Sequence, residues 1–372
     1  MKFLSAMALA AAAFAAPAAN AGKIVVGQVG PLTGLDATQG RAYGAGMELL
    51  FNSINKAGGL NGNTFSLIRK NDGGRAEDTV NLTRELLAEE KPLVLAGYFG
   101  TRNVSELANS GILEKEKIAV VGFRTAEVRS ETQYLYSVRA TLNDELEKLT
   151  VHLATIGITR LGLLYEDSPS APALLAAADQ ASKNAKVTIL TKATYPAGTA
   201  RVAPAVEAFI KSAPQAIILV TSGTAAAGFI DQYRIAGGIA QLFTHSGADI
   251  EQLAKRLTDE QMQGVAIAQV TPSPYKISGK LSKEFGDVVS KSPALEEPVS
   301  YAMMEGYIAA KVIAEAVRKQ GARPTREGMI AALDSMQSYD LGGYLVGFKP
   351  GMRSGSRFVE LSIISRGGKI RQ

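Results

Sequence analysis

Hydrophobic residues between Gly22 and position 139 follow two alternating patterns. Short apolar runs have the length of buried β-strands, and between them apolar residues recur every three or four positions, as on one face of a helix. The expected strands are 23–29, 65–72, 93–97, 118–123 and 134–139, and the expected helices lie around 47–54, 80–90 and 106–113. This regular alternation predicts a doubly wound parallel sheet with helices on both faces.

The same alternation begins again at Leu142 and continues to about residue 272. The expected strands are 160–167, 186–196, 216–222, 241–246 and 264–272, and the expected helices are 142–156, 171–182, 201–212, 224–236 and 249–257. The last part of the chain is mostly helical, with expected helices at 277–291, 299–320 and 325–336 and closing strands at 344–348 and 358–365. Two α/β blocks of similar construction predict two Rossmann-like lobes, each with a parallel sheet.

The first predicted helix has a sharply marked end. Gly58 and Gly59 follow its last apolar position, and Asn61-Gly62 comes two residues later. Glycine adopts the positive φ that ends helices, and Asn-Gly favours a tight reversal. We therefore expect a short connection from this helix into the strand at 65–72.

Residues 1–21 have the features of a cleavable secretory signal peptide. Lys2 supplies a positive start, an apolar run covers 3–16, and Ala19 and Ala21 form a small-residue cleavage pattern. The run is shorter than the roughly 18 residues that a spanning helix needs, which argues against a membrane anchor. No cysteine is present for lipid attachment. We expect an exported, soluble mature chain.

Composition narrows the class of protein further. The length of 372 residues favours two domains over one, and 46% hydrophobic with 20% charged residues is typical of ordinary globular cores. With no cysteine, the fold depends on packing and not on disulfides. The net charge of +5 is scattered among acidic and turn residues without interleaved aromatic residues. We therefore expect no nucleic-acid partner.

An enzyme is the main alternative class, and the sequence offers little for one. His152 and His245 are the only histidines. His245 precedes Ser246, with Asp249 nearby, but adjacent side chains at a strand end diverge and do not form a nucleophile–base pair. The chain has no G-x-S-x-G motif, no phosphate-binding G-x-x-x-x-G-K and no metal-spaced His/Cys cluster. We expect no catalytic residues, no metal and no cofactor.

Several motifs, in order along the chain, resemble the leucine/isoleucine/valine-binding family, the periplasmic type I solute-binding proteins of ABC importers. The motifs are IVVGQVGPLTG (24–34), G-x-x-x-G (40–44), INKAGGLNG (54–62), AGYFGT (96–101), VVGFRTA (120–126), VRATLND (138–144), LGLLYEDSPSA (161–171) and IAGG (235–238). Together they cover nearly all of the chain after residue 21.

The resemblance implies two discontinuous lobes joined by three hinge crossovers, with the ligand held in the cleft between them. The crossovers would lie near 139–144, 270–274 and 346–355. Lobe 1 would comprise 22–141 plus 273–346, and lobe 2 would comprise 142–272 plus 347–372. The resemblance also implies a monomer in the periplasm that delivers a small-molecule ligand to the permease and ATPase subunits of an inner-membrane ABC importer.

The resemblance also implies ligand-binding positions. Thr125 matches the carboxylate-binding hydroxyl, and Gly100 stands where serine is usual, with Thr101 beside it as a substitute. Phe123 matches a position whose backbone contacts ligand, and Asp144 matches the acidic residue after the first crossover. Further candidates are Tyr98 and Arg124, which flank these loops, and four positions where the chain departs from the family's pattern: Gln39, Ser170, Ser222 and Ser246.

These departures bear on the chemistry of the ligand. Ser246 stands where the family has the acid that holds a ligand ammonium, which leaves Asp144 as the evident counter-charge. A buried ammonium without a counter-charge is costly by several kcal/mol. Arg102 and Arg124 instead add positive charge beside the anion-binding loops. We hypothesise a carboxylate ligand without an obligatory α-amino group, such as an aromatic acid. Binding of a branched-chain amino acid or amide, and a role as a ligand-sensing receptor, remain alternatives.

Overall fold

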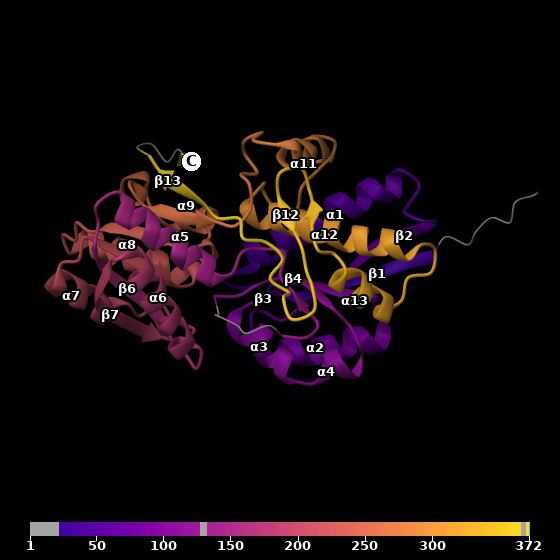
Figure 1. Ribbon diagram of the computed structural model, residues 1–372, viewed down its shortest axis with the longest axis horizontal. Helices are drawn as coiled ribbons and strands as arrows, with labels where there is room; N and C mark the ends of the chain where they lie inside the picture. The colour runs from indigo at the N-terminus through magenta and orange to yellow at the C-terminus, as the bar shows by residue number, and fades with distance from the viewer. Residues whose placement is uncertain (1–21, 127–131, 366–369, 372) are drawn as a thin grey trace, which may run out of the picture.

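The computed structural model describes residues 22–126, 132–365 and 370–371. The predicted signal peptide at 1–21 lies outside the described residues. The chain forms two α/β lobes side by side, each built on its own sheet (Figure 1). Within the described ranges, no helix combines the length and apolar character needed to cross a membrane.

The first sheet has five parallel strands in the order β2-β1-β3-β4-β5. Its strands are β1 (Gly22–Gly30), β2 (Asn63–Asn71), β3 (Val94–Phe99), β4 (Val120–Arg124) and β5 (Leu135–Tyr136). One face packs on α1 (Ala37–Lys56), α11 (Lys280–Ser290), α12 (Tyr301–Gln320) and α13 (Arg326–Asp334). The other face packs on α2 (Ala76–Glu89), α3 (Thr101–Asn109) and α4 (Ile112–Lys115).

The second sheet has seven strands in the order β14-β13-β10-β9-β8-β6-β7. The parallel strands are β6 (Arg160–Asp167), β7 (Thr188–Pro196), β8 (Ala216–Val220), β9 (Gln241–Thr244) and β10 (Ala266–Gln269). The antiparallel edge is formed by β13 (Glu360–Ile364) and β14 (Ile370–Arg371). One face packs on α5 (Leu142–Thr155) and α6 (Ala171–Ala185). The other packs on α7 (Ala203–Ser212), α8 (Gly223–Ile235), α9 (Ile250–Arg256) and α10 (Asp259–Met262).

Two long helices from opposite ends of the chain, α1 and α12, form the main helix pair of the first lobe. Glycine allows their backbones to touch: a Cβ on Gly46 would lie 1.9 Å from the carbonyl oxygen of Met303, and a Cβ on Gly306 would lie 2.0 Å from that of Tyr43. The close approach buries both helices and brings α12 beside β3 and β4. The N-terminal end of α12 is thereby placed at the junction between the lobes.

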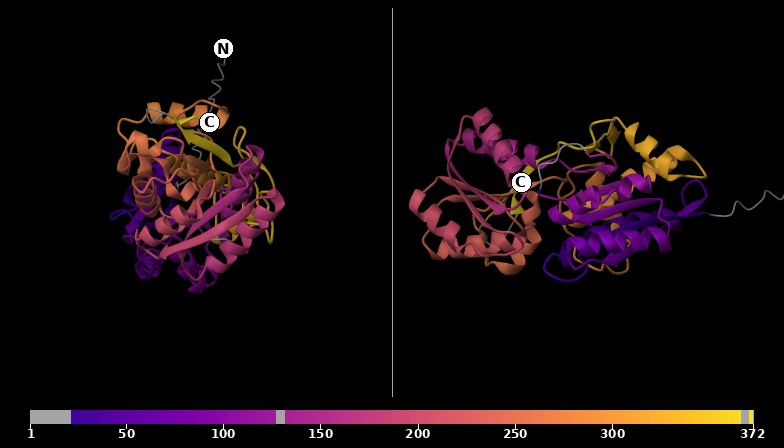
Figure 2. Two further views of the ribbon diagram at one scale, coloured as in Figure 1. Left: turned by 90° about the vertical axis from the view of Figure 1, so that its left-hand side faces the viewer. Right: turned by 90° about the horizontal axis from the view of Figure 1, so that it is seen from below.

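The chain passes between the two sheets three times, as expected (Figure 2). The first crossover is the segment 137–141, the second is 270–279 and the third is 347–359. The two-stranded sheet of β11 (Tyr339–Asp340) and β12 (Leu345–Val346) precedes the third crossover. A lobe that is left and re-entered in this way is discontinuous in sequence.

Most predicted elements are confirmed, and three predictions are wrong in detail. The single helix expected around 106–113 is two helices, because Gly111 adopts φ 73° between α3 and α4. The strand expected at 134–139 is only two residues long. The strand expected at 344–348 pairs in the small sheet and joins neither main sheet. The turn after α1 is confirmed, with positive φ at Gly58, Gly59, Asn61 and Gly62.

Candidate functional site

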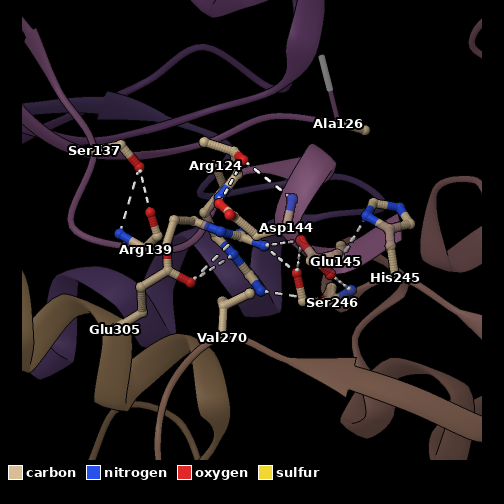
Figure 3. A network of polar contacts seen from close by, with 12 residues as sticks. Arg124, Ala126, Ser137, Arg139, Asp144, Glu145, His245, Ser246, Val270 and Glu305 are labelled. Atoms are coloured by element: carbon tan, nitrogen blue, oxygen red, sulfur yellow. Dashed lines mark hydrogen bonds and ion pairs between the residues drawn. The ribbon is translucent and has the colours of Figure 1, made fainter. Parts of the chain in front are cut away.

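Buried polar side chains from both lobes meet where the first crossover passes between the sheets (Figure 3). The first lobe contributes the end of β4, the start of α1 and the start of α12. The second lobe contributes the start of α5 and the loop after β9. Ligands of open α/β sheets bind beyond the carboxyl ends of parallel strands, where β4 and β9 deliver their residues. We call this set of side chains the junction network, formed by Gln39, Arg124, Arg139, Glu145, Ser246, Asp249 and Glu305.

Arg124, the last residue of β4, is the centre of the junction network. Its side chain is only 5% exposed and contacts both lobes. Nη1 donates to Gln39 Oε1 and lies 3.5 Å from Asp249 Oδ2, and Nε lies 3.3 Å from Glu305 Oε2. Charge-assisted hydrogen bonds are usually about 2.7–2.9 Å, so the two carboxylates neutralise Arg124 only loosely.

Arg139 and Ser246 join the first crossover to the second lobe. Arg139 Nη2 donates to Ser246 Oγ and to Glu145 Oε1, the latter at 3.2 Å. Glu145 in turn accepts from the backbone N–H of Ser246 at 2.6 Å and from its hydroxyl at 2.9 Å. Ser246 is therefore fully engaged by protein groups at the position where the resemblance implied a ligand contact.

Glu305 connects the two arginines from the side of the first lobe. Its Oε2 lies 3.3 Å from Arg124 Nε and 3.5 Å from Arg139 Nη1. The residue lies in the second turn of α12, whose close packing on α1 brings it to the junction. Its charge also raises the pKa of the nearby Tyr43, although burial of that hydroxyl is the larger cause.

Several buried atoms of the junction network have no hydrogen-bond partner in the described part of the protein. The unsatisfied donors include Arg124 Nε and Gln39 Nε2, and the unsatisfied acceptors include Glu305 Oε1. An unpaired buried polar atom costs about 1–3 kcal/mol, and such atoms are rare unless they serve a ligand, water or ion. The described part of the network therefore has unused hydrogen-bonding capacity beside Arg124.

His245 shapes the loop that carries Ser246. Its Nδ1 accepts from the N–H of Gly247 at 3.2 Å, and its Nε2 lies 3.0 Å from the carbonyl oxygen of Thr221. Both contacts suit a neutral imidazole with the proton on Nε2. Burial lowers the pKa of His245, which favours that neutral form. Its two ring nitrogens bind backbone groups, which leaves neither available as a base for Ser246.

The loops at the ends of β3 and β4 form a second polar feature next to Arg124. Gly100 adopts φ 102° and begins α3, and its N–H donates to the carbonyl oxygen of Arg124 at 3.0 Å. Thr101 Oγ1 accepts from the N–H of Ala126 at 3.0 Å and from the hydroxyl of Thr125 at 3.3 Å. Both threonines are half-buried. The start of α3 supplies backbone N–H groups and a partial positive charge, which suit an anion.

Other predicted site residues lie outside the junction network. Tyr98 and Phe123 belong to the hydrophobic cluster between the first sheet and α2–α4, and Tyr98 Oη bonds to Thr83 at 2.9 Å. Asp144 forms a capping box with Thr141 at the start of α5 and lies 3.1 Å from Arg357 on the third crossover. Ser222 caps α8 with its side chain, and Ser170 occupies the N-cap position of α6 without a side-chain capping bond. Gln39, by contrast, belongs to the network and lies in the first turn of α1.

Sequence reasoning did not single out Arg139, Glu145, Asp249 or Glu305 as site residues. Arg139 lies inside the quoted motif at 138–144, so its motif position was a usable signal. Glu145 and Glu305 lie in helical stretches where the hydrophobic pattern marks their positions as part of the buried face. A charged residue on an otherwise apolar face is a signal that could have identified both.

Comparison with known proteins establishes the family. Residues 23–358 match the model of the periplasmic binding protein family, and the chain belongs to that family. A substrate-binding periplasmic protein from Ralstonia solanacearum is 34% identical, with a TM-score of 0.87 over 94% of this chain and 99% of that chain. The Leu/Ile/Val-binding protein homolog 8 of Brucella suis biovar 1 is 23% identical over 363 residues, which cover 92% of this chain and 87% of that protein.

A third similar protein has been solved with a ligand. It is the solute binding protein of an ABC transporter from Rhodopseudomonas palustris HaA2, in complex with p-hydroxybenzoic acid. It is 18% identical, with a TM-score of 0.76 over 94% of this chain and 95% of that chain. At this level of identity the likeness concerns the fold. The fold is that of a solute-binding protein, with two lobes joined by three crossovers.

Proposed function

We propose that this protein captures a small carboxylate between its two lobes and delivers it to the permease of an ABC importer without changing it covalently. It acts in the periplasm after removal of residues 1–21. The lobes that close on the ligand are 22–141 plus 273–346 and 142–272 plus 347–372. The permease with its ATPase subunits is the partner, and the protein acts as a monomer.

The observation that carries this proposal is a pair of buried donors at the junction: among the described residues, Gln39 Nε2 has no hydrogen-bond partner and Arg124 Nε has only the 3.3 Å ion pair with Glu305. A ligand carboxylate beside them would accept both N–H groups and would exchange the loose contacts of Arg124 for short, charge-assisted ones. The hydroxyls of Thr101 and Thr125 and the backbone at the start of α3 lie along the same edge of the sheet. They would complete the recognition of the anion.

The class of carboxylate is suggested by the two positions at which the resemblance implied an acidic partner for a ligand ammonium. Asp144, the expected partner of a ligand ammonium, is held by Thr141 and Arg357. The position of Ser246 carries no charge of its own. The p-hydroxybenzoic acid complex of the Rhodopseudomonas protein supports an aromatic acid. We therefore favour a carboxylate that does not need an α-ammonium group.

A second candidate, a branched-chain amino acid, is favoured by one observation. Glu305 Oε1 is buried, has no hydrogen-bond partner among the residues that the structure describes, and would accept an ammonium hydrogen. The name of the Brucella relative is consistent with such a ligand. The two candidates differ only in whether the ligand's nitrogen contributes to affinity.

Matched ligand pairs separate the candidates. We expect calorimetric titration to show tighter binding of 4-methylpentanoate than of leucine, and of 3-phenylpropanoate than of phenylalanine, by tenfold or more. Each pair differs only by the α-ammonium group, and 4-hydroxybenzoate serves as the aromatic reference. Tighter binding of leucine than of 4-methylpentanoate would overturn the carboxylate proposal in favour of the amino acid. Detectable conversion of any bound compound would overturn both.

A further inference from the structure

Glu251, on α9 of the second lobe, lies where the second crossover meets the first lobe. Its Oε1 accepts from the hydroxyl of Tyr275 on that crossover and from the backbone N–H of Tyr301, the first residue of α12, at 2.9 Å. The rings of Tyr275 and Tyr301 pack edge to face at 5.9 Å. One carboxyl group thus joins α9 of the second lobe, the second crossover and the start of α12 in the first lobe.

The other oxygen of Glu251 has an unusual environment. Oε2 is buried and has no hydrogen-bond donor among the described residues. Asp249, the N-cap residue of the same helix, is close enough for its charge to act on the Glu251 carboxyl group. Two carboxylates cannot hydrogen bond to each other unless one carries a proton, because both are acceptors only. Burial, followed by the charge of Asp249, raises the pKa of Glu251 to about 8.

Asp249 connects this pair to the junction network. It is buried, its Oδ1 accepts from the N–H of Gln252 at 3.0 Å, and its Oδ2 lies 3.5 Å from Arg124 Nη1. Asp36, in the loop before α1, feels the charges of Asp249 and Arg124, although burial is the main cause of its raised pKa. The titratable and charged groups on the elements around the pair are Asp36, Arg124, Arg139, Glu145, His245, Lys255, Arg256, Tyr275, Tyr301 and Glu305.

We propose that the Asp249–Glu251 pair is a proton-operated latch between the lobes. With one shared proton, Glu251 bonds to Asp249, to Tyr275 and to the start of α12, and the lobes remain joined. Without that proton, two adjacent carboxylates repel each other at the junction, and the lobes open so that water can solvate them. Release of the captured carboxylate is the consequence for transport, and this last step rests on the proposed function.

The size of the effect follows from proton linkage. Opening exposes Glu251 to water and returns its pKa toward the ordinary value near 4.5. The closed form therefore binds the proton more tightly than the open form. Between about pH 4.5 and about pH 8, where only the closed form holds the proton, each pH unit shifts the closed–open equilibrium about tenfold toward the open form. Above about pH 8 both forms are deprotonated, and the shift reaches its limit.

The ligand-independent test is small-angle X-ray scattering of the mature protein between about pH 5 and about pH 9. We expect the radius of gyration to increase with pH in the wild type and to stay constant in Glu251→Gln. The glutamine amide imitates the protonated carboxyl group, since it donates to Asp249 while its oxygen accepts from Tyr275. Glu284→Gln is the matched control, because Glu284 accepts from Tyr307 at 2.8 Å within the first lobe. This control is expected to expand like the wild type.

A second variant, Tyr275→Phe, provides a test of the latch that does not depend on the folding of Glu251→Gln. The hydrogen bond from Tyr275 lowers the pKa of Glu251, so Tyr275→Phe is expected to move the expansion to higher pH. A radius of gyration that is independent of pH in the wild type would overturn the latch. Equal expansion in the wild type and in Glu251→Gln would overturn it as well.

Titration with 4-hydroxybenzoate tests the coupling to transport. We expect the wild type to bind about tenfold more weakly at about pH 9 than at about pH 7, and Glu251→Gln to change less than twofold. Equal loss of affinity in both proteins would refute the coupling. Absence of binding at every pH, together with pH-dependent expansion, would refute the proposed aromatic ligand and leave the latch supported. The latch and the proposed aromatic ligand can therefore be refuted independently, the latch by scattering and the ligand by titration.

Discussion

The hydroxyl of Tyr344 lies 2.8 Å from the carbonyl oxygen of Val138, which belongs to the first crossover. The same hydroxyl lies 2.9 Å from the carbonyl oxygen of Val270, the first residue of the second crossover. Tyr344 itself directly precedes β12, from which the third crossover departs. The fully buried hydroxyl of Tyr344 therefore contacts the backbone of the first and second crossovers, close to the point where the third crossover begins.

Replacing Tyr344 by phenylalanine removes the single O–H group that the two carbonyl oxygens share. We expect Tyr344→Phe to lower the free energy of unfolding by about 1–3 kcal/mol, the usual effect of an unsatisfied buried polar group. We also expect a broader distribution of lobe orientations in scattering. Tyr307→Phe is the control, because its hydroxyl bonds within the first lobe. If Tyr307→Phe changes the scattering to the same extent, Tyr344 has no special role at the crossovers.

The glycines between α1 and α12 give a steric prediction. Gly46→Ala or Gly306→Ala places a methyl group about 2 Å from a backbone carbonyl of the other helix, so the helices must separate. We expect a loss of roughly 2–4 kcal/mol, as for other overpacked or disrupted core sites. Chemical denaturation measures this loss.

The matched control for that experiment is Gly286→Ala. Gly286 lies inside α11, and a Cβ there meets nothing within 4 Å. Alanine has a higher helix propensity than glycine, so this variant is expected to gain roughly 0.5–1 kcal/mol. A loss of stability in Gly286→Ala, or no loss at Gly46 and Gly306, would contradict the packing argument.

Arg124 and Arg102 both carry positive charge near the loops at the ends of β3 and β4. Arg124 is buried and Arg102 is exposed, so we expect different roles for them. The side chain of Arg102 is 84% exposed and pairs with Glu106 on the same helix. We expect Arg124→Gln to weaken carboxylate binding by about 10- to 100-fold, because a charged donor is lost. It also leaves Asp249 and Glu305 less well compensated, at an expected loss of about 3 kcal/mol. Calorimetric titration and denaturation measure the two effects.

Arg102→Gln is the control for this prediction. An exposed ion pair contributes little, so we expect stability to change by less than about 1 kcal/mol and affinity not to change. Equal losses of affinity in the two variants would indicate that long-range charge, and not contact at Arg124, attracts the ligand.

Because His245 is buried, we expect the free energy of unfolding to decrease at acidic pH. Because burial lowers its folded-state pKa below 6.5, the unfolded chain binds more protons than the folded protein at mildly acidic pH. The contribution of His245 is therefore complete above about pH 6.5 and declines as the pH falls, by up to about 1.4 kcal/mol per unit. Denaturation curves from about pH 5 to about pH 8 measure this slope.

Two variants test whether His245 causes this dependence of stability on pH. His245→Asn keeps a side-chain acceptor for the N–H of Gly247 and removes the titrating group, so we expect a shallower dependence on pH. His152→Gln changes a half-buried histidine on α5, whose pKa is lowered by partial burial and by Lys148. Its effect is expected to be smaller. An unchanged slope in His245→Asn would show that other groups are responsible.

Local sequence signals predicted the elements because those signals act over a few residues. The apolar run at β1 and the glycines after α1 were sufficient to locate a strand, a helix end and a turn. The prediction of an element failed where the neighbouring residues did not indicate whether a helix continues or ends. The stretch 106–113 has a helical pattern, but the backbone at Gly111 interrupts it.

The site was predicted only in part, because its contacts join residues that are far apart in sequence. Arg124 and Gln39 were identified as candidates, and the structure places them in contact. The anionic partners Asp249 and Glu305 reach Arg124 from α9 and α12, and no local pattern specifies that meeting.

The sequence by itself determined the α/β character, the alternation of two blocks and the resemblance to periplasmic binding proteins. These properties depend on periodicity, turn residues and motif order, which are local and additive along the chain. Only the tertiary structure decided which charged residues are buried together at the lobe junction. Burial and pairing of charges depend on distances between segments more than a hundred residues apart, and these distances are fixed by packing of whole helices and sheets.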